Sequence, residues 1–385
     1  MIGTRGVPAR YGGFETAVEE IGRRLVERGQ EVTVYCRGDG DPGGRDHLGM
    51  RLVHLPAVHA RSLETLSHTA VSVAHLWRTG GHDVATVFNA ANAPFLPALR
   101  AAHVPVAVHV DGLEWQRDKW SGTGRHYYRW AESLAVRWAD ALIADAQGIA
   151  DYYRREFGVD TELLAYGAPI QPAPRTDRLA ELGLTAGSYH LVVARFEPEN
   201  HVAEIVDGYR RSNARNPLVV VGSAPYGDRY TARVRDLAGA DPRVVLLGGV
   251  WDQELLDQLY AGCATYLHGH SVGGTNPSLL RAMGAAAPVV AFDVVFNREV
   301  AGPDARFFTS PDQLRGIVER AEADPVPVAE SGRRLQARAA SRYRWDEVAD
   351  GYESLLKRLA AGESARGSAS GRRVGRSRSS EPVRR

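Results

Sequence analysis

The sequence lacks the features of several protein classes. Its 385 residues include only two cysteines, Cys36 and Cys263, which stand far apart in apolar surroundings. This argues against a disulfide framework and a metal site, and fits a reducing cytosol. No apolar run approaches the roughly 20 residues that span a bilayer, and the N-terminus has no signal-peptide pattern. A formal net charge of +1 gives no overall attraction to nucleic acid. We therefore expect a cytoplasmic protein, soluble or peripheral, with no metal and no nucleic-acid partner.

Dinucleotide and P-loop motifs are also missing. The segment from Met1 to Gly6 reads as the end of a strand that enters a glycine-rich loop, and a helix with an apolar face follows from Phe14 to Leu25. This order is typical of a nucleotide-type α/β unit, but the G-x-G-x-x-G spacing and the P-loop lysine are absent, which argues against a dinucleotide site. Because so little strand precedes the loop, we expect translation to begin upstream; the alternative is a sheet that tolerates a two-residue stub.

The residues that are present predict two α/β domains. Hydrophobic residues make up 44% of the chain, and short apolar segments alternate with amphipathic ones in both halves, as in parallel sheets covered on both faces. Residues 167–187 contain three prolines and little apolar periodicity, which is typical of a linker. We expect two doubly wound, Rossmann-like domains, at 1–166 and 188–361, with final helices at 311–323 and 345–359 that pack back.

The end of the chain has a different composition. Residues 362–385 contain seven arginines against Glu363 and Glu381, many serines and almost nothing apolar. This composition predicts disorder. Two interpretations stay open: a solvated extension, or a basic tail that contacts an anionic surface such as the inner face of the plasma membrane.

The stretch from His268 to Met283 is the strongest candidate for a binding site. An apolar strand precedes it, and Leu279 and Met283 recur at helical spacing after it. Asn276 can cap this helix and Pro277 fits its first position. Glycines in the turn allow free N–H groups to converge on an anion, most plausibly a phosphate. The alternative is an ordinary strand-to-helix loop.

A second candidate follows the expected strand at 104–110. Residues 111–120 bring carboxylates and two tryptophans to the carboxyl end of a parallel strand, where open α/β sheets bind ligands. This composition suggests a sugar platform. The alternative is a surface loop whose tryptophans pack on their neighbours.

The arrangement resembles the GT-B fold of nucleotide-sugar glycosyltransferases, with two doubly wound domains facing a cleft. Segments from the first residues to about residue 350 are similar to the branch of glycosyltransferase family 4 associated with rhamnosyl transfer. These segments are Gly3 to Pro8 with Tyr11 to Thr16, Asp111 to Trp115, Ala165 to Ala168, Ala194 to Asn200, His268 to Leu280 and Phe296 to Val300.

The resemblance implies a retaining, metal-independent transfer of a hexosyl unit, rhamnosyl in this branch. The donor would be a nucleotide diphosphate sugar such as dTDP-rhamnose, and the acceptor a glycan or lipid-linked glycan in surface polysaccharide synthesis. No cofactor is implied, because the nucleotide sugar is a substrate. In retaining enzymes of this fold the leaving phosphate is credited with taking the acceptor proton, so no protein nucleophile is needed.

The same resemblance assigns roles to individual residues. Arg195 would neutralise the leaving diphosphate in place of a metal. Asp111 stands where many family 4 enzymes have a histidine beside the reacting sugar, and its role as a base stays open. The candidates are Asp111 and Arg195 as catalytic residues; Arg195, Glu199, Asn200, His270, Gly273, Gly274, Thr275, Asn276, Ser278 and Arg281 for the donor; and Gly12, Gly13, Glu114 and Trp115 for the acceptor.

Three positions depart from the family pattern. Family 4 enzymes commonly carry two glutamates eight positions apart, where this chain has Gly273 and Arg281. Arginine only donates hydrogen bonds, so it cannot accept them from ribose hydroxyls; it would weaken donor binding or bind a phosphate itself. Asn200 replaces a lysine that would bind the diphosphate.

Two alternative functions stay open. One, which follows from these departures, is a catalytically impaired homologue that acts as a binding protein or is a decaying copy, and the other is an epimerase of similar fold.

Overall fold

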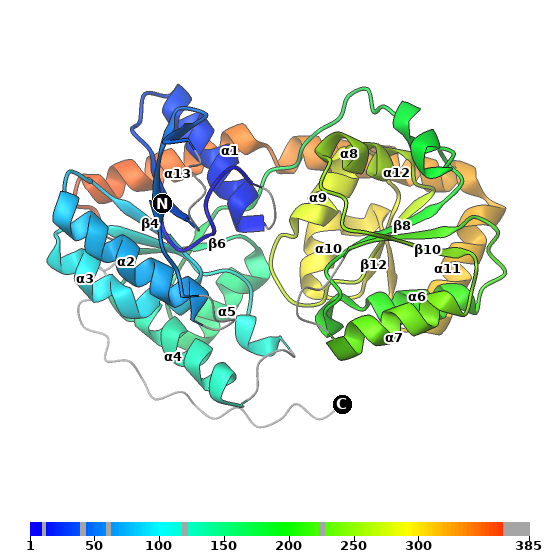
Figure 1. Cartoon of the computed structure of the whole chain (residues 1–385), viewed down its shortest axis with the longest axis horizontal. Coiled ribbons are helices and arrows are strands. Elements are labelled where there is room, and N and C mark those ends of the chain that lie inside the picture. Colours follow the sequence, from blue (N-terminus) through cyan, green and yellow to red (C-terminus); the bar gives the residue numbers. More distant parts are fainter. Residues whose placement is uncertain (10–12, 39–43, 59–62, 118–121, 223–227, 365–385) are drawn as a thin grey trace.

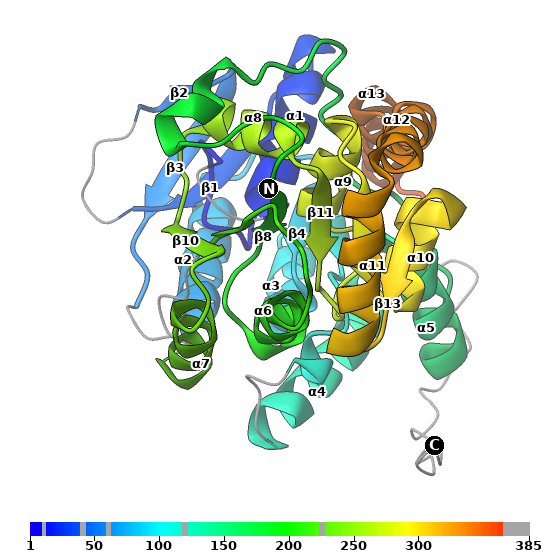
Figure 2. The same ribbon diagram turned by 90° about the vertical axis from the view of Figure 1, so that its right-hand side faces the viewer.

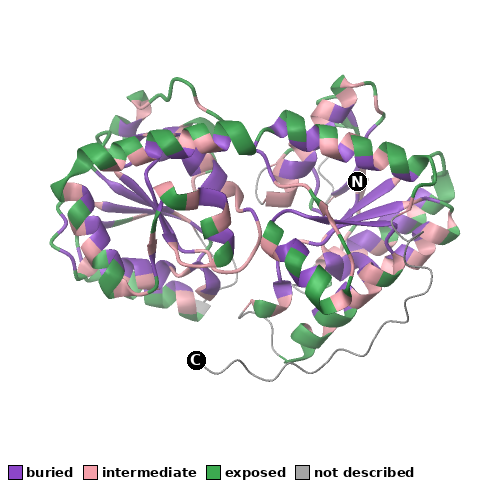
Figure 3. Cartoon of the chain, turned by 180° about the vertical axis from the view of Figure 1, so that it is seen from behind, coloured by how far each residue is buried: buried purple, intermediate pink, exposed green. Residues whose placement is uncertain are grey.

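The protein consists of two α/β halves that lie side by side (Figure 1). The computed structural model describes residues 1–9, 13–38, 44–58, 63–117, 122–222 and 228–364. In both halves the strands are buried and the outward sides of the helices are exposed (Figure 3). None of the helices in these ranges has the length and apolar character needed to span a bilayer. The predicted α/β class with two doubly wound sheets is confirmed.

The N-terminal half contains short buried strands between longer helices. Its elements are α1 (Gly13–Glu27), β1 (Thr33–Arg37), β2 (Asp46–His47), β3 (Met50–Leu55), α2 (Glu64–Thr79), β4 (Ala85–Phe88), the 3₁₀ helix η1 (Ala90–Phe95), α3 (Leu96–Ala101), β5 (Val106–His109), η2 (Glu114–Gln116), α4 (Gly122–Trp138), β6 (Ala141–Ala144), α5 (Gln147–Phe157) and β7 (Glu162–Leu163).

Residues 1 and 2 join two groups of strands in this half. One group has the order β1-β3-β2 and the other β4-β5-β6-β7. Ile2 forms a parallel bridge with Val87 of β4, and the Tyr35 N–H of β1 donates to the carbonyl oxygen of Met1 at 3.0 Å. The buried Ile2 therefore occupies the central place that a first strand takes in this fold.

Helices cover the two faces of the N-terminal sheet unequally. Val73 of α2, Leu99 of α3, Ala135 of α4 and Ile149 of α5 belong to one hydrophobic cluster. The other face packs on α1 through residues such as Ile21. The helices α2 to α5 therefore form one outer layer on a single side of the sheet.

The C-terminal half contains a six-stranded sheet in the order β10-β9-β8-β11-β12-β13. Figure 2 looks onto this half and shows α6 beside α11. From the linker onward, its elements are η3 (Asp177–Leu182), β8 (His190–Val193), η4 (Pro198–Asn200), α6 (Val202–Arg210), β9 (Leu218–Val221), α7 (Asp228–Gly239), β10 (Val244–Gly248), α8 (Gln253–Gly262), β11 (Thr265–His268), α9 (Pro277–Gly284), β12 (Val289–Phe292), α10 (Val295–Ala301), η5 (Gly302–Asp304), β13 (Arg306–Phe308), α11 (Pro311–Ala323) and α12 (Pro325–Arg342).

The chain then returns to the N-terminal half. Its last helix, α13 (Trp345–Ala360), packs on α1, where Arg24 Nε lies 2.8 Å from Asp346 Oδ1. The outgoing and returning segments touch, because the Ala168 N–H donates to the carbonyl oxygen of Tyr343 at 2.7 Å. A Cβ placed on Gly167 would lie 2.3 Å from Trp345 Cδ2, so only glycine fits against this ring.

Two helices of the C-terminal half were not predicted from the sequence. The segments 295–301 and 325–342 form α10 and α12, and neither was predicted. The helix α12 starts with Pro325 and Pro327, and prolines usually indicate a loop. Proline is nevertheless tolerated in the first turn of a helix, because the N–H that it lacks has no intrahelical partner there.

Candidate active site

The strand order of the C-terminal sheet reverses between β8 and β11. β8 leads to β9 on one side, and β11 leads to β12 on the other. Open α/β sheets bind ligands beyond the carboxyl ends of the strands at such a point. Arg195 follows β8, and His270 with the glycine turn follows β11. The topology therefore brings the predicted cation and the predicted anion-binding turn to the same edge of the sheet.

The start of α9 agrees with its prediction. Asn276 Oδ1 accepts a hydrogen bond from the Ser278 N–H at 2.9 Å, and Pro277 is the first helical residue. Ser278 Oγ donates to Asn276 Oδ1 at 2.8 Å and accepts from the Tyr266 hydroxyl at 3.0 Å. The side chains of Asn276 and Ser278 therefore hold the helix start in place. Backbone N–H groups of the first turn remain the natural donors to an anion.

Loops of the N-terminal half lie directly on the glycine turn. A Cβ placed on Gly112 would lie 2.4 Å from Gly273 Cα, and one on Gly274 would lie 1.9 Å from Asp145 Oδ1. Gly273 has φ 142°, which a side chain would strain. Glycine is thus required at the turn for two reasons, an unusual backbone conformation and close contact between the halves.

Asp145, at the end of β6, joins the two halves. Its Oδ2 accepts a hydrogen bond from the Thr275 N–H at 3.1 Å, and its carbonyl oxygen accepts one from the Thr275 hydroxyl. Both residues are buried, and Asp145 Oδ1 has no hydrogen-bond partner among the described residues. Burial, with the neighbouring charge of Asp111, raises the pKa of Asp145 to about 8. Thr275 therefore serves as a contact between the halves, in addition to its predicted place in the donor turn.

Arg195 presents an exposed guanidinium beside this turn. It forms no ion pair or side-chain hydrogen bond with another residue in the described ranges. His270 lies near enough for the charge of Arg195 to affect it, and its ring stacks on His268 at 4.4 Å between centroids. Burial, together with nearby positive charge, lowers the pKa of His270 well below its usual range, so the ring is neutral. An uncompensated cation and a neutral imidazole suit a phosphate ester.

Asn200 does not face the same way as Arg195. Its Nδ2 donates to the carbonyl oxygen of Arg195 at 2.9 Å, and the residue is buried. The Asn200 amide therefore shapes the Arg195 loop, and the place of Asn200 among the donor residues stays a prediction.

Glu199 and Glu114 meet at a shared arginine. Arg117 Nε lies 2.5 Å from Glu114 Oε1, and Arg117 Nη1 lies 3.7 Å from Glu199 Oε1. Glu199 belongs to the C-terminal half and is buried, while Glu114 and Arg117 belong to the N-terminal half. The predicted donor residue Glu199 and the predicted acceptor residue Glu114 are therefore partners of one bridge across the two halves.

Asp111 lies in the loop after β5. It has φ 64°, and its Oδ1 accepts from the Gly112 N–H at 2.8 Å. Asn89 Nδ2 lies 3.4 Å from Asp111 Oδ2. The neighbouring His109 is buried, which lowers its pKa to about 3, and its Nδ1 accepts from the Asp111 N–H at 3.4 Å. A neutral histidine thus supports the loop that presents the half-buried Asp111 carboxylate next to the glycine turn.

The predicted acceptor residues differ in their placement. Gly13 starts α1 and touches α9, since a Cβ there would lie 2.9 Å from Pro277 Cγ. Gly12 lies outside the described residues. Trp115 packs on Tyr152 with 6.3 Å between ring centroids, and Arg129 lies over its ring at 5.2 Å. This packing agrees with the alternative interpretation of the stretch, in which its tryptophans pack on their neighbours, and the acceptor role of the half-buried Trp115 stays a prediction.

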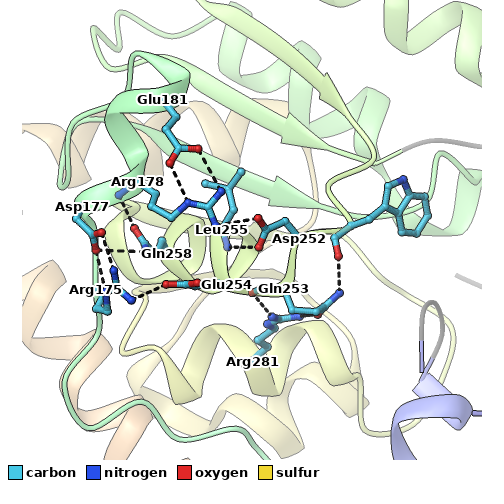
Figure 4. Close-up of polar contacts among 11 residues, drawn as sticks. Arg175, Asp177, Arg178, Glu181, Asp252, Gln253, Glu254, Leu255, Gln258 and Arg281 are labelled. Carbon is cyan, nitrogen blue, oxygen red and sulfur yellow. Dashed lines mark hydrogen bonds and ion pairs between the residues drawn. The ribbon is translucent and has the colours of Figure 1, made fainter. Parts of the chain in front are cut away.

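Arg281 points along α9 toward α8 (Figure 4). Its guanidinium donates to the Gln253 side-chain oxygen at 2.7 Å and to the Gln253 carbonyl oxygen at 2.9 Å, and Nε lies 2.6 Å from Asp257 Oδ1. These contacts occupy all three nitrogens. The Arg281 guanidinium is thus engaged within the protein, and its place among the donor residues stays a prediction.

Figure 4 also shows how the same end of α8 is fixed to the linker. Asp252 caps α8 by accepting a hydrogen bond from the Leu255 N–H at 3.1 Å, and it pairs with Arg178 at 2.8 Å. Arg178 also pairs with Glu181. Arg281 is therefore one member of a polar network that holds α8, α9 and η3 together.

Three residues of the site were missed from the sequence. His109 ends β5, Arg117 lies in the loop after it and Asp145 follows β6. Asp145 and Arg117 each have a partner far away in the chain, Thr275 and Glu199. The only available signal was position, since each stands at the carboxyl end of a parallel strand or in the loop after it.

In the described part of the chain, His, Cys, Asp and Glu side chains form no group of three or more that could hold a metal ion.

Comparison with known proteins agrees with this fold. Residues 12–167 match the glycosyl transferase 4-like domain and residues 188–323 match glycosyl transferases group 1. Alpha-maltose-1-phosphate synthase from Mycolicibacterium smegmatis is 24% identical over 397 residues, which cover 92% of this chain and 97% of that protein. Sucrose-phosphate synthase from Thermosynechococcus elongatus superposes with a TM-score of 0.79 at 19% identity, over 91% of this chain and 94% of that one. HepE from Anabaena, in complex with UDP and glucose, gives 0.73 at 19% identity, over 91% and 98%. The chain therefore belongs to the GT-B glycosyltransferases, with a glycosyl transferase 4-like domain before a glycosyl transferases group 1 domain.

Proposed function

We propose that this chain is a retaining glycosyltransferase that moves a hexosyl unit, rhamnosyl in the first place, from a nucleotide diphosphate sugar to a glycan or lipid-linked acceptor. Surface polysaccharide synthesis is the process that fits such an acceptor. The observation that carries the proposal is the exposed Arg195 beside the N-terminus of α9, where the strand order reverses. HepE, of the same fold, was crystallised with UDP-glucose, which supports a nucleotide sugar as the donor class.

The chemistry of the proposed reaction follows from the charges at this edge. Breaking the glycosidic bond leaves a diphosphate anion, which Arg195 and the N–H groups at the start of α9 would stabilise. Neutral His270 would donate a hydrogen bond to the donor without adding charge. Asp111 would orient the acceptor, and the leaving phosphate would take the acceptor proton. Under this proposal the chain needs neither a metal nor a cofactor, because the nucleotide sugar is a substrate.

We propose the cytoplasm as the place of action, at the inner face of the plasma membrane when the acceptor is lipid-linked. Both cysteines are buried and free, which suits a reducing compartment. The proposal on location and the proposal on chemistry are independent, so refuting one leaves the other in place.

The test is a donor screen with the full-length protein. Purified chain is incubated with dTDP-rhamnose, UDP-glucose or GDP-mannose, with and without EDTA, while released nucleoside diphosphate and donor binding are measured. We expect one donor to be bound and turned over at the same rate in EDTA, and Arg195→Ala to lose turnover. Binding without turnover would favour the impaired homologue. The hydrogen bond from Arg281 to Gln253 supports that alternative, because it occupies the arginine within the protein. No binding and no turnover with any donor would refute the enzyme proposal.

A further inference from the structure

The outer layer of the N-terminal half has a surface that the proposed reaction does not use. The helices α2 and α4 both pack on η1, with α3 in the same layer, on the side of the sheet opposite α1 (Figure 1). The outward sides of α2 and α4 are called the α2–α4 face below. It is defined by Val71, Trp77, Arg78, Arg125, Trp130 and Arg137, of which all are exposed.

The α4 part of this face is basic and aromatic. Trp130 is 51% exposed, and Arg125, Arg129 and Arg137 are exposed around it. The only carboxylate of the helix, Glu132, is buried and accepts a hydrogen bond from the Tyr152 hydroxyl at 2.8 Å. The surface of α4 therefore carries positive charge without a carboxylate to balance it.

The α2 part is apolar where a surface helix is normally polar. Val71 is 37% exposed and Trp77 is 62% exposed, and Ala74 is exposed between them. Residues 65–82 contain no aspartate or glutamate, and Arg78 is the basic residue next to Trp77. A helix that buries apolar residues inward and also exposes apolar residues outward lacks the polar face of an ordinary surface helix.

The exposed arginines of this face have no carboxylate partner. Arg78, Arg125 and Arg137 form no ion pair with any residue that the structure describes. Arg137 has its guanidinium over the Trp138 ring at 5.4 Å. Guanidinium groups without a carboxylate partner can bind phosphate, with which arginine forms two parallel hydrogen bonds.

These properties match a lipid surface better than a folded partner. Tryptophan prefers the headgroup level of a bilayer, where its ring meets apolar chains and its N–H meets water. Unpaired arginines beside it are complementary to anionic headgroups. A bilayer accepts such scattered projections, whereas a protein partner needs a matching shape over the whole contact.

We propose that the α2–α4 face docks the protein on an anionic lipid bilayer, with Trp77 and Trp130 at the headgroup level and Arg78, Arg125 and Arg137 on lipid phosphates. Because α4 begins at Gly122, soon after the bridge residue Arg117, docking on α4 brings the acceptor side of the site toward the lipid. The entry of a lipid-linked acceptor rests on the proposed function, but the docking itself does not.

Vesicle sedimentation tests the docking without donor or acceptor. The full-length protein is mixed with vesicles of equal phosphatidylglycerol and phosphatidylcholine, or of phosphatidylcholine alone. We expect binding only to the anionic vesicles, falling as salt is raised. Arg125→Ser with Arg137→Ser should lower the partition coefficient about 25-fold, about fivefold for each basic residue removed from the surface. Trp130→Ser should lower it further.

Three matched variants make the test specific. Arg315→Ser with Arg333→Ser removes the same charge from exposed positions on α11 and α12, and Trp251→Ser removes a tryptophan that is 59% exposed in the C-terminal half. Both should bind as the wild type does. A third variant, with serine in place of Arg372, Arg373, Arg376 and Arg378, separates the basic tail from the face, and it should still lose binding when Arg125 and Arg137 are replaced.

The possible results divide cleanly. Loss of binding in the face variants, with unchanged thermal melting and wild-type binding in the controls, supports the proposal. Absence of wild-type binding to anionic vesicles overturns it, as does equal binding by face variants and controls, or binding that disappears with the tail alone. Retention on an RNA column without vesicle binding also overturns it. Donor turnover with a soluble acceptor, measured on the same samples, reports separately on the proposed function.

Discussion

The contact between Asp145 and Thr275 predicts a separation of donor binding from turnover. The Asp145 carboxyl belongs to the N-terminal half, whereas Arg195, His270 and the glycine turn all belong to the C-terminal half. Replacing Asp145 by alanine leaves the buried Thr275 N–H without its partner, which costs about 1–3 kcal/mol. This loss falls on the contact between the halves. The arrangement in which the two halves touch, called closed below, should therefore become about 5-fold to 150-fold less favoured relative to one in which they are apart.

The assay compares three quantities in the wild type and in Asp145→Ala. These are the Kd for the nucleoside diphosphate, kcat for transfer, and the distance between labels on the two halves. We expect the Kd to change less than threefold, while kcat falls roughly 10-fold or more and the mean distance increases. Asp145→Asn keeps an acceptor for the Thr275 N–H and should retain most of kcat.

Two results would refute this reasoning. If Asp145→Ala kept both the wild-type kcat and the wild-type distance, the contact would have no role in closure. If it weakened diphosphate binding as much as Arg195→Ala does, Asp145 would act on the donor site itself. Thr275→Val supplies an independent check, because it removes the hydroxyl bond to the Asp145 carbonyl oxygen and leaves the backbone N–H in place.

Three further predictions concern charge. Arg195→Ala should lower kcat about 100-fold to 1000-fold by removing the charge that stabilises the leaving group, and Arg195→Lys should restore part of it in the same turnover assay. Arg281→Glu should place a carboxylate against Asp257, lower the Tm by about 4 °C in a thermal melt, and leave activity no higher than in the wild type; increased activity would mean that the arginine damages the site. The raised pKa of Asp145, about 8 against 3.8 in the unfolded chain, means that the folded state keeps a proton that the unfolded chain releases near pH 4. The free energy of unfolding should therefore decrease as the pH rises from about 4 to about 8, and melts between pH 6 and 9 should show the Tm of the wild type falling relative to Asp145→Asn.

Much of the fold could be predicted because it follows from local patterns. Alternating apolar segments indicate buried parallel strands, and the Asn276-Pro277 pair marks the start of α9 to the residue. The helix α12 was not predicted; it starts with Pro325 and Pro327, which a first helical turn accepts although prolines are rare in the middle of a helix. Local patterns thus locate most elements. A proline, however, is compatible with the first turn of a helix and disrupts the middle of one, so its presence alone does not decide between helix and loop.

The candidate site was predictable only where it depends on one half of the molecule. The placing of Arg195 and the glycine turn follows from strand ends of a single sheet. Asp145 and Arg117 act across the two halves, and no local pattern says how two domains meet. The direction of Arg281 was equally hidden, because it depends on Asp257 of a helix that packs beside α9.

The return of the chain at Gly167 and Trp345 limits how the two halves can move. Two segments cross between them, and the crossings touch through the hydrogen bond from Ala168 to Tyr343. Two connections at one place leave rotation about that place as the easiest movement and resist sliding of one half along the other. The loop that carries Asp111 would then approach the glycine turn along one arc. Each time the halves close, the acceptor side and the donor side would return to the same relative position.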